Sequence, residues 1–428
     1  MSGEDWIVLL PWEAKEVIER GDGWGHLTCR ISAPDRAALV VALSNEDSDR
    51  VSVATDPGHF LMTADFHPVG HWYAAPSELA ISEYFLVRQG REFSFDEFKK
   101  LVPKAERPAV GKWSIAVTYC AKPPAISDNE TLPAWSAWSV THSAVRPIHL
   151  DIRDGTELIA ALGDLWPARA LSSKRVLLFG AGSIGGAAAA SLASYGAGEI
   201  DIVDPDRLLF HNIPRHVLAS KYVGMTKVNA LARMLGDAWP ECQVTPWGID
   251  LVTHANVVRP LLDKADIVVC TVDGVEARRV ANFLARRACK PIVFACVLGD
   301  GRYGEILRIR PLPEVGCLEC QRRHLQEEER IDLEPTLDRG YGAGTRHNPM
   351  TAVGGDLHLM GQLTAKITVA TLLRAQGELD QTLVDDNLVV ALRPTPGYSD
   401  PFDTTRVLDQ KWYRAGRPYG DCPACNAT

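Results

Sequence analysis

The sequence predicts an α/β protein, with a doubly wound parallel sheet in its larger part and an α+β domain at its N-terminus. Two observations support this prediction. After residue 174, short and wholly apolar segments alternate with helical segments, as expected of parallel strands covered on both faces. A glycine-rich turn, Gly180-Ala-Gly182-Ser-Ile-Gly185-Gly186, joins the first of these strands to the first helix, which is where phosphate-binding turns occur.

Local patterns place the elements of the sheet. Apolar runs between turn residues predict strands, and periodic or alanine-rich segments predict helices. The predicted strands are residues 176–179, 200–203, 267–270 and 291–296. The predicted helices are residues 187–195, 223–236, 275–288 and 356–373. Strands and helices in this alternation build one Rossmann-like sheet with helices on both faces.

The first part of the chain has a different composition. Eight of the eleven tryptophans lie at or before Trp166. We predict domains at residues 1–150 and 151–428, the first an accessory domain of unassigned role. Its predicted elements are strands at 27–31 and 51–55, a helix at 95–101 and a loop at 122–133. Its aromatic residues either fill a core or form a peptide-recognition surface.

Bulk properties argue against several classes of protein. The net charge of −9 lacks the basic footprint of a nucleic-acid binder. No segment approaches the roughly 18 consecutive apolar residues of a membrane span, so no membrane association is expected. The acidic N-terminal residues lack the layout of a signal peptide, and we therefore expect a cytoplasmic protein.

Each glycine of the turn has a predicted role in binding phosphate. Gly180 permits the tight turn, Gly182 lets the backbone approach phosphate, and Gly185 lets helix and strand pack closely. Asp204 ends the next strand, where a carboxylate can accept hydrogen bonds from ribose hydroxyls. These residues predict a nucleotide site rather than a mere turn, and they leave NAD and ATP both open.

Four cysteines occur in two closely spaced pairs, Cys317-Leu-Glu-Cys320 and Cys422-Pro-Ala-Cys425. CxxC spacing lets two sulfur atoms of one turn reach one ion, and four thiolates satisfy the tetrahedral preference of zinc. We therefore predict one structural Zn²⁺ that attaches the C-terminal segment to the sheet. Four unrelated free cysteines are the alternative.

A further set of spaced motifs carries a resemblance to a known family. The run Asp204-Pro-Asp206-x5-Asn212-x2-Arg215, followed by Gly224-x2-Lys227, resembles the signature of the ThiF/MoeB/HesA family, bacterial relatives of ubiquitin-activating enzymes. The resemblance continues through Asp273-x4-Arg278-x3-Asn282 and both cysteine pairs, and it covers about residues 170–428. Several motifs in the family's order make it specific.

The resemblance implies ATP rather than NAD as the nucleotide. It implies that Arg215 and Lys227 bind phosphates and act in catalysis, and that Asp273 also acts there and holds Mg²⁺. Asp204 binds the ribose in this pattern. The implied nucleotide-binding residues are Gly180, Gly182, Gly185, Asp204, Asp206, Asn212, Arg215, Lys227 and Asp273. Taken singly, each charged residue could equally form an ordinary surface ion pair.

Two departures from the family pattern bear on mechanism. His216 stands where the family often has glutamine, although an imidazole can still donate a hydrogen bond. Many relatives carry a nucleophilic cysteine in a crossover segment that corresponds to residues 321–350, and this segment contains no cysteine. We therefore expect the chain to stop at the acyl adenylate. Cys289 and Cys296 are the alternative nucleophiles, and we predict both to be buried in the sheet layer.

A weaker resemblance lies in the first domain. The stretch Asp65-Phe-His67-Pro68-x8-Ser77 resembles the His-Pro…Ser stretch of JAB metalloproteases. Asp65 and Ala80 stand at two metal-ligand positions of that pattern, so we expect no protease activity. We expect His67 and His71 to be ordinary loop residues.

The sequence therefore predicts an adenylyltransferase that uses ATP and Mg²⁺ to activate the C-terminal carboxylate of a small ubiquitin-like (β-grasp) protein. A separate conjugating enzyme and a homodimer are expected partners, and the helix at 356–373 lies near the dimer interface or simply packs in the core. The alternatives are adenylation of a short peptide in natural-product maturation, a non-catalytic nucleotide-binding scaffold, and an NAD-dependent oxidoreductase.

Overall fold

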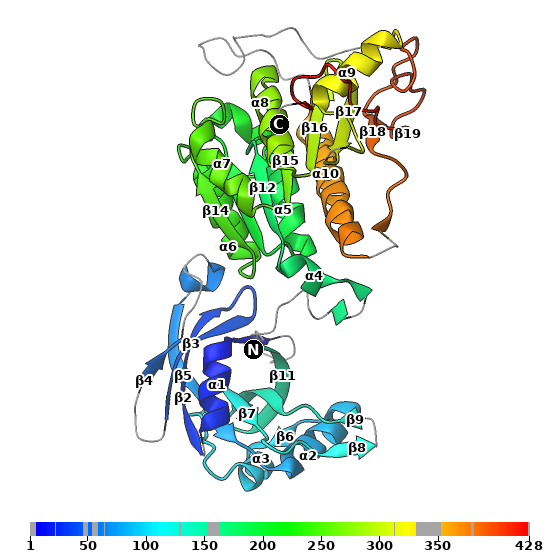
Figure 1. Cartoon of the computed structure of the whole chain (residues 1–428). Coiled ribbons are helices and arrows are strands. Elements are labelled where there is room, and N and C mark those ends of the chain that lie inside the picture. The colour runs from blue at the N-terminus through cyan, green and yellow to red at the C-terminus, as the bar shows by residue number, and fades with distance from the viewer. Residues whose placement is uncertain are drawn as a thin grey trace. The chain divides into compact units, whose positions relative to one another are not determined.

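The computed structural model describes residues 6–426, except 22, 46–49, 54–58, 64, 128–129, 153–161, 164, 312, 331–351 and 378–380, and at 65–69 it describes the backbone alone. The chain divides into two compact units, Met1–Thr156 and Glu157–Thr428 (Figure 1). Each unit has its own sheet and its own hydrophobic core.

The sheet of the first unit closes on itself. Its strands are β1 (Ile7–Leu10), β2 (Trp24–Ser32), β3 (Ala37–Asn45), β4 (Arg50–Ser52), β5 (Asp65–Ala74), β6 (Phe93–Ser94), β7 (Trp113–Tyr119), β10 (Trp135–Thr141) and β11 (Ala144–Ile152). The order is β1-β11-β10-β7-β5-β2-β3-β4, and β1 pairs with β3 as well as with β11. This second pairing closes a ring, and β4 and β6 pair with the ring strands β3 and β11.

The helices of this unit pack against its strands. They are α1 (Trp12–Arg20), α2 (Ser77–Arg88) and α3 (Phe95–Leu101), together with the short 3-10 helix η1 (Phe60–Thr63). Two faces of the sheet carry separate cores, and α1 contributes Ala14 and Ile18 to one of them. Trp72 and Trp138 are fully buried, so these two large aromatic residues fill cores rather than a recognition surface.

The predictions for this unit are only partly confirmed. The helix at 95–101 is α3, whose start is fixed by a capping box between Ser94 and Glu97. The strand at 27–31 lies inside β2. The strand at 51–55 overlaps β4 only at its first two residues, because β4 ends at Ser52, and residues 54–55 lie outside the described residues. The loop at 122–133 contains the short strands β8 (Ala125–Ser127) and β9 (Glu130–Thr131).

The weak resemblance to JAB metalloproteases is tested only in part. His67 and His71 both lie in strand β5, so their predicted place in a loop is wrong, and His71 is buried. The side chains of Asp65, His67 and Pro68 lie outside the described residues.

The second unit contains an eight-stranded sheet. Its strands are β12 (Arg175–Phe179), β13 (Glu199–Val203), β14 (Gln243–Trp247), β15 (Ile267–Cys270), β16 (Ile292–Leu298), β17 (Tyr303–Ile309), β18 (Asn387–Ala391) and β19 (Gln410–Tyr413). The order is β14-β13-β12-β15-β16-β17-β18-β19. The strands from β14 to β16 are parallel, and the last three alternate in direction. From β12 the chain continues to β13 on one side, and it returns later to β15 on the other side. In doubly wound sheets the ligand crevice lies where the strand order reverses in this way, which here is the carboxyl end of β12.

Helices cover both faces of this sheet (Figure 1). They are α4 (Ala168–Ser172), α5 (Ser183–Tyr195), α6 (Lys227–Ala238), α7 (Ala255–Lys264), α8 (Val275–Arg287), α9 (Leu318–Glu327) and α10 (Gly354–Ala375), with the 3-10 helices η3 (Phe210–Arg215) and η4 (Ser220–Tyr222). One core packs α5, α6 and α10 against the sheet, and the other packs α7, α8 and the start of α9. Helix α10 packs along α5, where a Cβ at Gly361 would lie 2.5 Å from the carbonyl oxygen of Ile184.

The doubly wound prediction is confirmed in this unit, with errors at element ends. The strand at 267–270 is β15, and the helix at 275–288 is α8. The helix predicted from Val223 starts four residues later, because Gly224 has a positive φ of 96° that ends η4's turn and no helix can continue through it. The strands β14, β17, β18 and β19 were not predicted. No helix in the described ranges is long and apolar enough to cross a membrane.

Candidate functional site

The glycine turn is packed as its sequence requires. Gly180 has a φ of 95°, which only glycine adopts readily. A Cβ at Gly185 would lie 1.9 Å from the carbonyl oxygen of Gly180, so helix α5 could not approach the turn with any larger residue. A Cβ at Gly182 would meet nothing within 4 Å. Gly182 is the N-cap of α5, so the turn presents open space in front of helix N–H groups that lack intrahelical partners.

Two side chains from other elements brace this turn. The Thr271 hydroxyl, just after β15, lies 3.2 Å from the carbonyl oxygen of Phe179 and 3.1 Å from that of Gly180, and can donate to either. His216 Nε2 lies 2.8 Å from the carbonyl oxygen of Ala181. Its Nδ1 accepts from the backbone N–H of Leu218 at 3.2 Å. An acceptor at Nδ1 and a donor at Nε2 describe one tautomer of neutral imidazole.

The charge state of His216 agrees with these contacts. Burial lowers the pKa of His216 to about 4, and the cations Lys227 and Arg215 act in the same direction. The ring is therefore neutral at physiological pH. The Nε2–H of the neutral ring can donate to the carbonyl oxygen of Ala181, as the expectation for an imidazole at this position required.

Asp204 connects the turn to the loop that follows β13. Its Oδ2 accepts from the N–H of Ala181 at 2.7 Å, and its Oδ1 accepts from the N–H of Asp206 at 2.8 Å. The side chain is buried, and burial raises its pKa while the nearby Lys227 lowers it. Each oxygen already has one backbone donor and retains one lone pair.

Lys227 lies at the first position of α6 and points back toward the same loop. Its Nζ is 2.8 Å from Oδ2 of Asp206, and its side chain is only 11% exposed. The backbone N–H of Lys227 also donates to the carbonyl oxygen of Asp206 at 2.8 Å. The two predicted residues therefore form one unit, in which a largely buried ammonium is held beside the glycine turn.

Arg215 ends the 3-10 helix η3 and is half-buried. Asn212 is buried in the same helix, where its Oδ1 accepts from the N–H of Leu209 at 2.9 Å and so fixes the start of the turn. His358 of α10 lies 2.9 Å through Nε2 from the carbonyl oxygen of Arg215. Helix α10 therefore supports the backbone that carries the arginine.

Asp273 lies in the loop between β15 and α8. Burial raises the pKa of its carboxyl, whereas Arg215 and Lys227 lower it, and the nearby Asp204 raises it further. The residue nevertheless keeps contact with solvent, and the cation Arg278 also lies near it. The predicted charged residues from four separate segments thus meet at one edge of the sheet.

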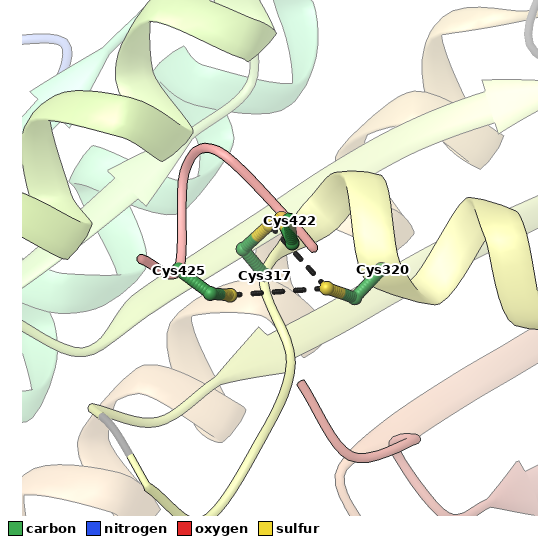
Figure 2. A group of neighbouring side chains, drawn as sticks. All are labelled: Cys317, Cys320, Cys422 and Cys425. Carbon is green, nitrogen blue, oxygen red and sulfur yellow. Dashed lines mark hydrogen bonds between the residues drawn. The ribbon is translucent and has the colours of Figure 1, made fainter. Parts of the chain in front are cut away.

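The four paired cysteines come together at the other predicted site (Figure 2). Their sulfur atoms all lie within 4.8 Å of one another, and all four residues are buried. Three separations are 3.9 Å (Cys317–Cys320), 3.5 Å (Cys317–Cys422) and 3.8 Å (Cys320–Cys425). Tetrahedral zinc–thiolate bonds of about 2.3 Å place sulfur atoms about 3.8 Å apart, so the donor set fits Zn²⁺.

Hydrogen bonds of backbone and amide groups join the segments that carry this cluster. The side chain of Gln321 binds the backbone of Gly416 from both sides, with its Oε1 2.8 Å from the N–H and its Nε2 3.1 Å from the carbonyl oxygen. Tyr419 donates its backbone N–H to the sulfur of Cys320 at 3.4 Å. Asn282 of α8 accepts from the N–H of Leu318 at 2.9 Å. The C-terminal segment is thereby attached to α9, and α9 to α8.

The two alternative nucleophiles differ from each other. Cys296 is buried in β16, as predicted. The prediction for Cys289 is wrong: it is exposed and lies just beyond the end of α8, at a positive φ of 52°. Cys289 lies in the turn between α8 and β16, which places it outside the sheet layer. The remaining cysteines outside the cluster, Cys29, Cys120, Cys242 and Cys270, are buried.

Sequence patterns alone missed several residues of this site. Thr271 contacts the glycine turn, and His358 contacts the backbone of Arg215. Glu305 of β17 forms a buried ion pair with Arg322 of α9. Thr271 follows a predicted strand, which is a usable signal because such positions lie at the carboxyl edge. His358, Glu305 and Arg322 are not themselves members of any of the motifs in the sequence.

The fold and these residues define a class of protein: a doubly wound nucleotide-binding sheet with a four-cysteine cluster that attaches its C-terminal segment. The model of the ThiF family matches residues 158–387, which is more than half of the chain. The chain therefore belongs to the ThiF family.

Individual relatives cover less of the molecule. Protein y4oA of Sinorhizobium fredii is 29% identical over 222 residues, which are 48% of this chain and 37% of that protein. The sulfur carrier protein ThiS adenylyltransferase of Escherichia coli is 27% identical over 161 residues, or 37% of this chain and 62% of that protein. Among solved structures, E. coli MccB in complex with N-formylated MccA aligns with 60% of this chain and 69% of its own at 20% identity. Its TM-score of 0.46 is too low to bear on function.

Proposed function

We propose that this protein is an ATP-dependent adenylyltransferase that activates the C-terminal carboxylate of a small ubiquitin-like protein of β-grasp fold. One observation carries the proposal. Arg215, Lys227 and Asp273 act electrostatically on one another beside a glycine turn with open space at Gly182, in a member of the ThiF family. Two cations and a carboxylate next to free helix N–H groups suit a triphosphate with a divalent cation better than they suit NAD.

The reaction has a simple balance of bonds. A carboxylate oxygen of the substrate attacks the α-phosphorus of ATP, and the bond from that phosphorus to the bridging oxygen of pyrophosphate breaks. Negative charge builds up on the phosphate oxygens in this step, where Lys227 and Arg215 would neutralise it. Mg²⁺ held by Asp273 would supply further neutralisation. Asp204 and the neutral imidazole of His216 both bind the backbone of Ala181, so the glycine turn is already oriented before ATP binds.

The choice of a ubiquitin-like substrate follows from a relative. The E. coli relative is named for its action on the sulfur carrier protein ThiS, and this chain spans 62% of its length. Zinc at the cysteine cluster would stabilise the C-terminal segment and would have no position open for a reactant, because four thiolates complete its coordination. A homodimer and a separate conjugating or acceptor protein belong to the same proposal.

The acyl adenylate would be the last intermediate formed on this chain. Residues 321–350 contain no cysteine. Of the cysteines outside the cluster, only Cys289 is exposed. It follows the end of α8, whereas Asp273 precedes the start of that helix. A thiolate nucleophile needs access to its substrate, which the buried thiols lack. The activated carboxylate would therefore pass to a thiol or amine of another protein.

ATP–pyrophosphate exchange tests the proposal. The purified protein is incubated with ATP, Mg²⁺, labelled pyrophosphate and a panel of β-grasp proteins that end in glycine, with the same proteins lacking that glycine as controls. Exchange that requires the terminal glycine is expected. Exchange with short peptides only would favour the peptide alternative. No exchange with any substrate, together with a melting temperature that rises with NAD and stays constant with Mg²⁺–ATP, would overturn the proposal.

The absence of a thioester has its own measurement. After reaction with an active substrate, a non-reducing gel should show no thiol-sensitive adduct of this chain. An adduct that disappears in Cys289→Ala or Cys296→Ala would contradict this expectation and would identify the nucleophile.

A further inference from the structure

Strand β17 and helix α9 are joined by a buried ion pair. Arg322 of α9 donates from Nη1 to Oε1 of Glu305 at 2.8 Å and from Nη2 to Oε2 at 2.5 Å. The two side chains are 7% and 0% exposed. The hydroxyl of Tyr413 also donates to Oε1, at 3.3 Å. A carboxylate this deep in the core is held ionised by its partners, and burying such a pair brings little net stability.

The register of the sheet places Glu305 next to a second arginine. Arg278, in the first turn of α8, lies with its guanidinium carbon 5.9 Å from the ring centroid of Phe294. Phe294 pairs with Leu307 of β17, so Glu305 is its diagonal neighbour on the same face. Arg278 is 3% exposed, and it lowers the pKa of Glu305 and also that of Asp273. The guanidinium of Arg278 therefore lies on the sheet face that carries Glu305, within electrostatic range of both carboxylates.

The backbone makes the connection to Asp273 short. Arg278 donates its N–H to the carbonyl oxygen of Gly274, the residue next to Asp273 and the N-cap of α8. A contact that holds the Arg278 guanidinium in place therefore also restrains the first turn of α8 and the loop that carries Asp273. Arg322, on the other side, lies two residues after Cys320 of the cysteine cluster.

We propose that Glu305 is a positioning residue for the nucleotide site: held in place by Arg322, it anchors Arg278, and Arg278 in turn fixes the Asp273 carboxylate that receives Mg²⁺–ATP. This inference rests on the proposed function. Glu305 would contact neither the nucleotide nor the metal, and it acts only through Arg278. The cysteine cluster takes part indirectly, because it fixes the start of the helix that carries Arg322.

A second buried pair supplies a matched control. Arg308, at the far end of the same strand β17, donates to Oδ1 of Asp386 at 3.0 Å and 2.7 Å. Asp386 is 5% exposed and also binds Arg310. Breaking this pair removes a comparable buried carboxylate at the opposite edge of the sheet, and no nucleotide-site residue is near it in the register.

The test is the affinity for Mg²⁺–ATP, measured by calorimetry on the full chain, together with zinc content and melting temperature. Glu305→Gln should weaken Mg²⁺–ATP binding roughly tenfold, as expected of a residue that acts through another. Asp386→Asn should lower the melting temperature and leave the affinity unchanged. In the double variant E305Q/R322M, which removes both members of the pair, stability should recover while the loss of affinity persists.

The Asp273→Asn background separates the possible outcomes. If Glu305 acts through Asp273, Glu305→Gln should cause little further loss of affinity there, because the effects of coupled residues are not additive. Equal losses in both backgrounds, or the same small change in E305Q and D386N, would overturn the inference while the proposed function stands. A wild-type protein that binds no Mg²⁺–ATP would overturn both.

Discussion

The nucleotide edge and the cysteine cluster are built in opposite ways. The nucleotide edge collects residues from Gly180 to Asp273, of which Gly180, Asp204 and Thr271 directly follow strand ends. Its polar side chains mostly bind backbone groups of neighbouring loops. The cysteine cluster joins two segments whose paired members lie 105 positions apart. Its four sulfur atoms are buried with few apolar neighbours, and they form a small core of their own.

The two sites therefore obtain their geometry from different sources. The order of strands in a parallel sheet places the nucleotide residues, so the frame remains when one side chain is removed. The segment after β19 lies outside the sheet and is attached to α9 by a few hydrogen bonds. A metal bound by the four cysteines would add to that attachment, as in other small metal-bound segments. Substitutions in the cluster should therefore affect stability, and substitutions at the edge should affect binding.

The largest effect is expected at the cluster. The double substitution Cys422→Ser and Cys425→Ser should release zinc and lower the free energy of unfolding by several kcal/mol, because metal-binding energy is folding energy. Metal analysis and thermal melting measure both. Cys289→Ser, at an exposed cysteine outside the cluster, is the control and should change neither. Wild-type protein without zinc and with four titratable thiols would contradict the assignment.

The next effect separates binding from stability. Asp273→Ala should reduce ATP–pyrophosphate exchange about 10²–10³-fold, a loss of about 3–4 kcal/mol of transition-state stabilisation comparable with removal of one key electrostatic group. The melting temperature should remain that of the wild type, because Asp273 is exposed. Glu276→Ala, an exposed carboxylate in the first turn of α8, is the control. Exchange at the wild-type rate in Asp273→Ala would remove this residue from the site.

A pH effect tests the neutral imidazole at the nucleotide edge. Burial lowers the pKa of His216 from 6.5 to about 4. Between these values the unfolded chain binds more protons than the folded chain, so stability falls as pH falls from about 6.5 to about 4, by up to about 3 kcal/mol. Denaturant unfolding at several pH values should show this slope in the wild type and a weaker slope in His216→Gln. Equal slopes in the two proteins would show that His216 is not the titrating group.

The smallest effect distinguishes two glycines of one turn. Gly185→Ala places a Cβ against a backbone oxygen and should destabilise the protein by about 1–3 kcal/mol. Gly182→Ala meets no protein atom, so it should leave the melting temperature unchanged and weaken ATP binding by filling the space in front of the helix N-terminus. Thermal melting and calorimetry on both variants make the comparison. A destabilised Gly182→Ala with normal ATP affinity would reverse it.

Local sequence determined much of the second unit. The strand at 267–270, the glycine turn and both cysteine pairs are each encoded by a few adjacent residues, so backbone conformation and ligand type follow from residue type. The closed ring of the first unit escaped prediction because β1 pairs with β3 and β11, and such long-range pairing leaves no periodic signal within either strand.

Only the tertiary structure decided how the site is supported. Thr271, His358 and the pair of Glu305 with Arg322 come from elements that the chain order does not connect. Each is an ordinary polar residue in its own segment, and it acquires a role only through what packs against it. The sequence by itself determined which residues carry charge, turn and thiol at the two sites. The packing of α8, α9 and α10 on the sheet decided which of their polar groups are buried together, because burial and partner depend on contacts between distant segments.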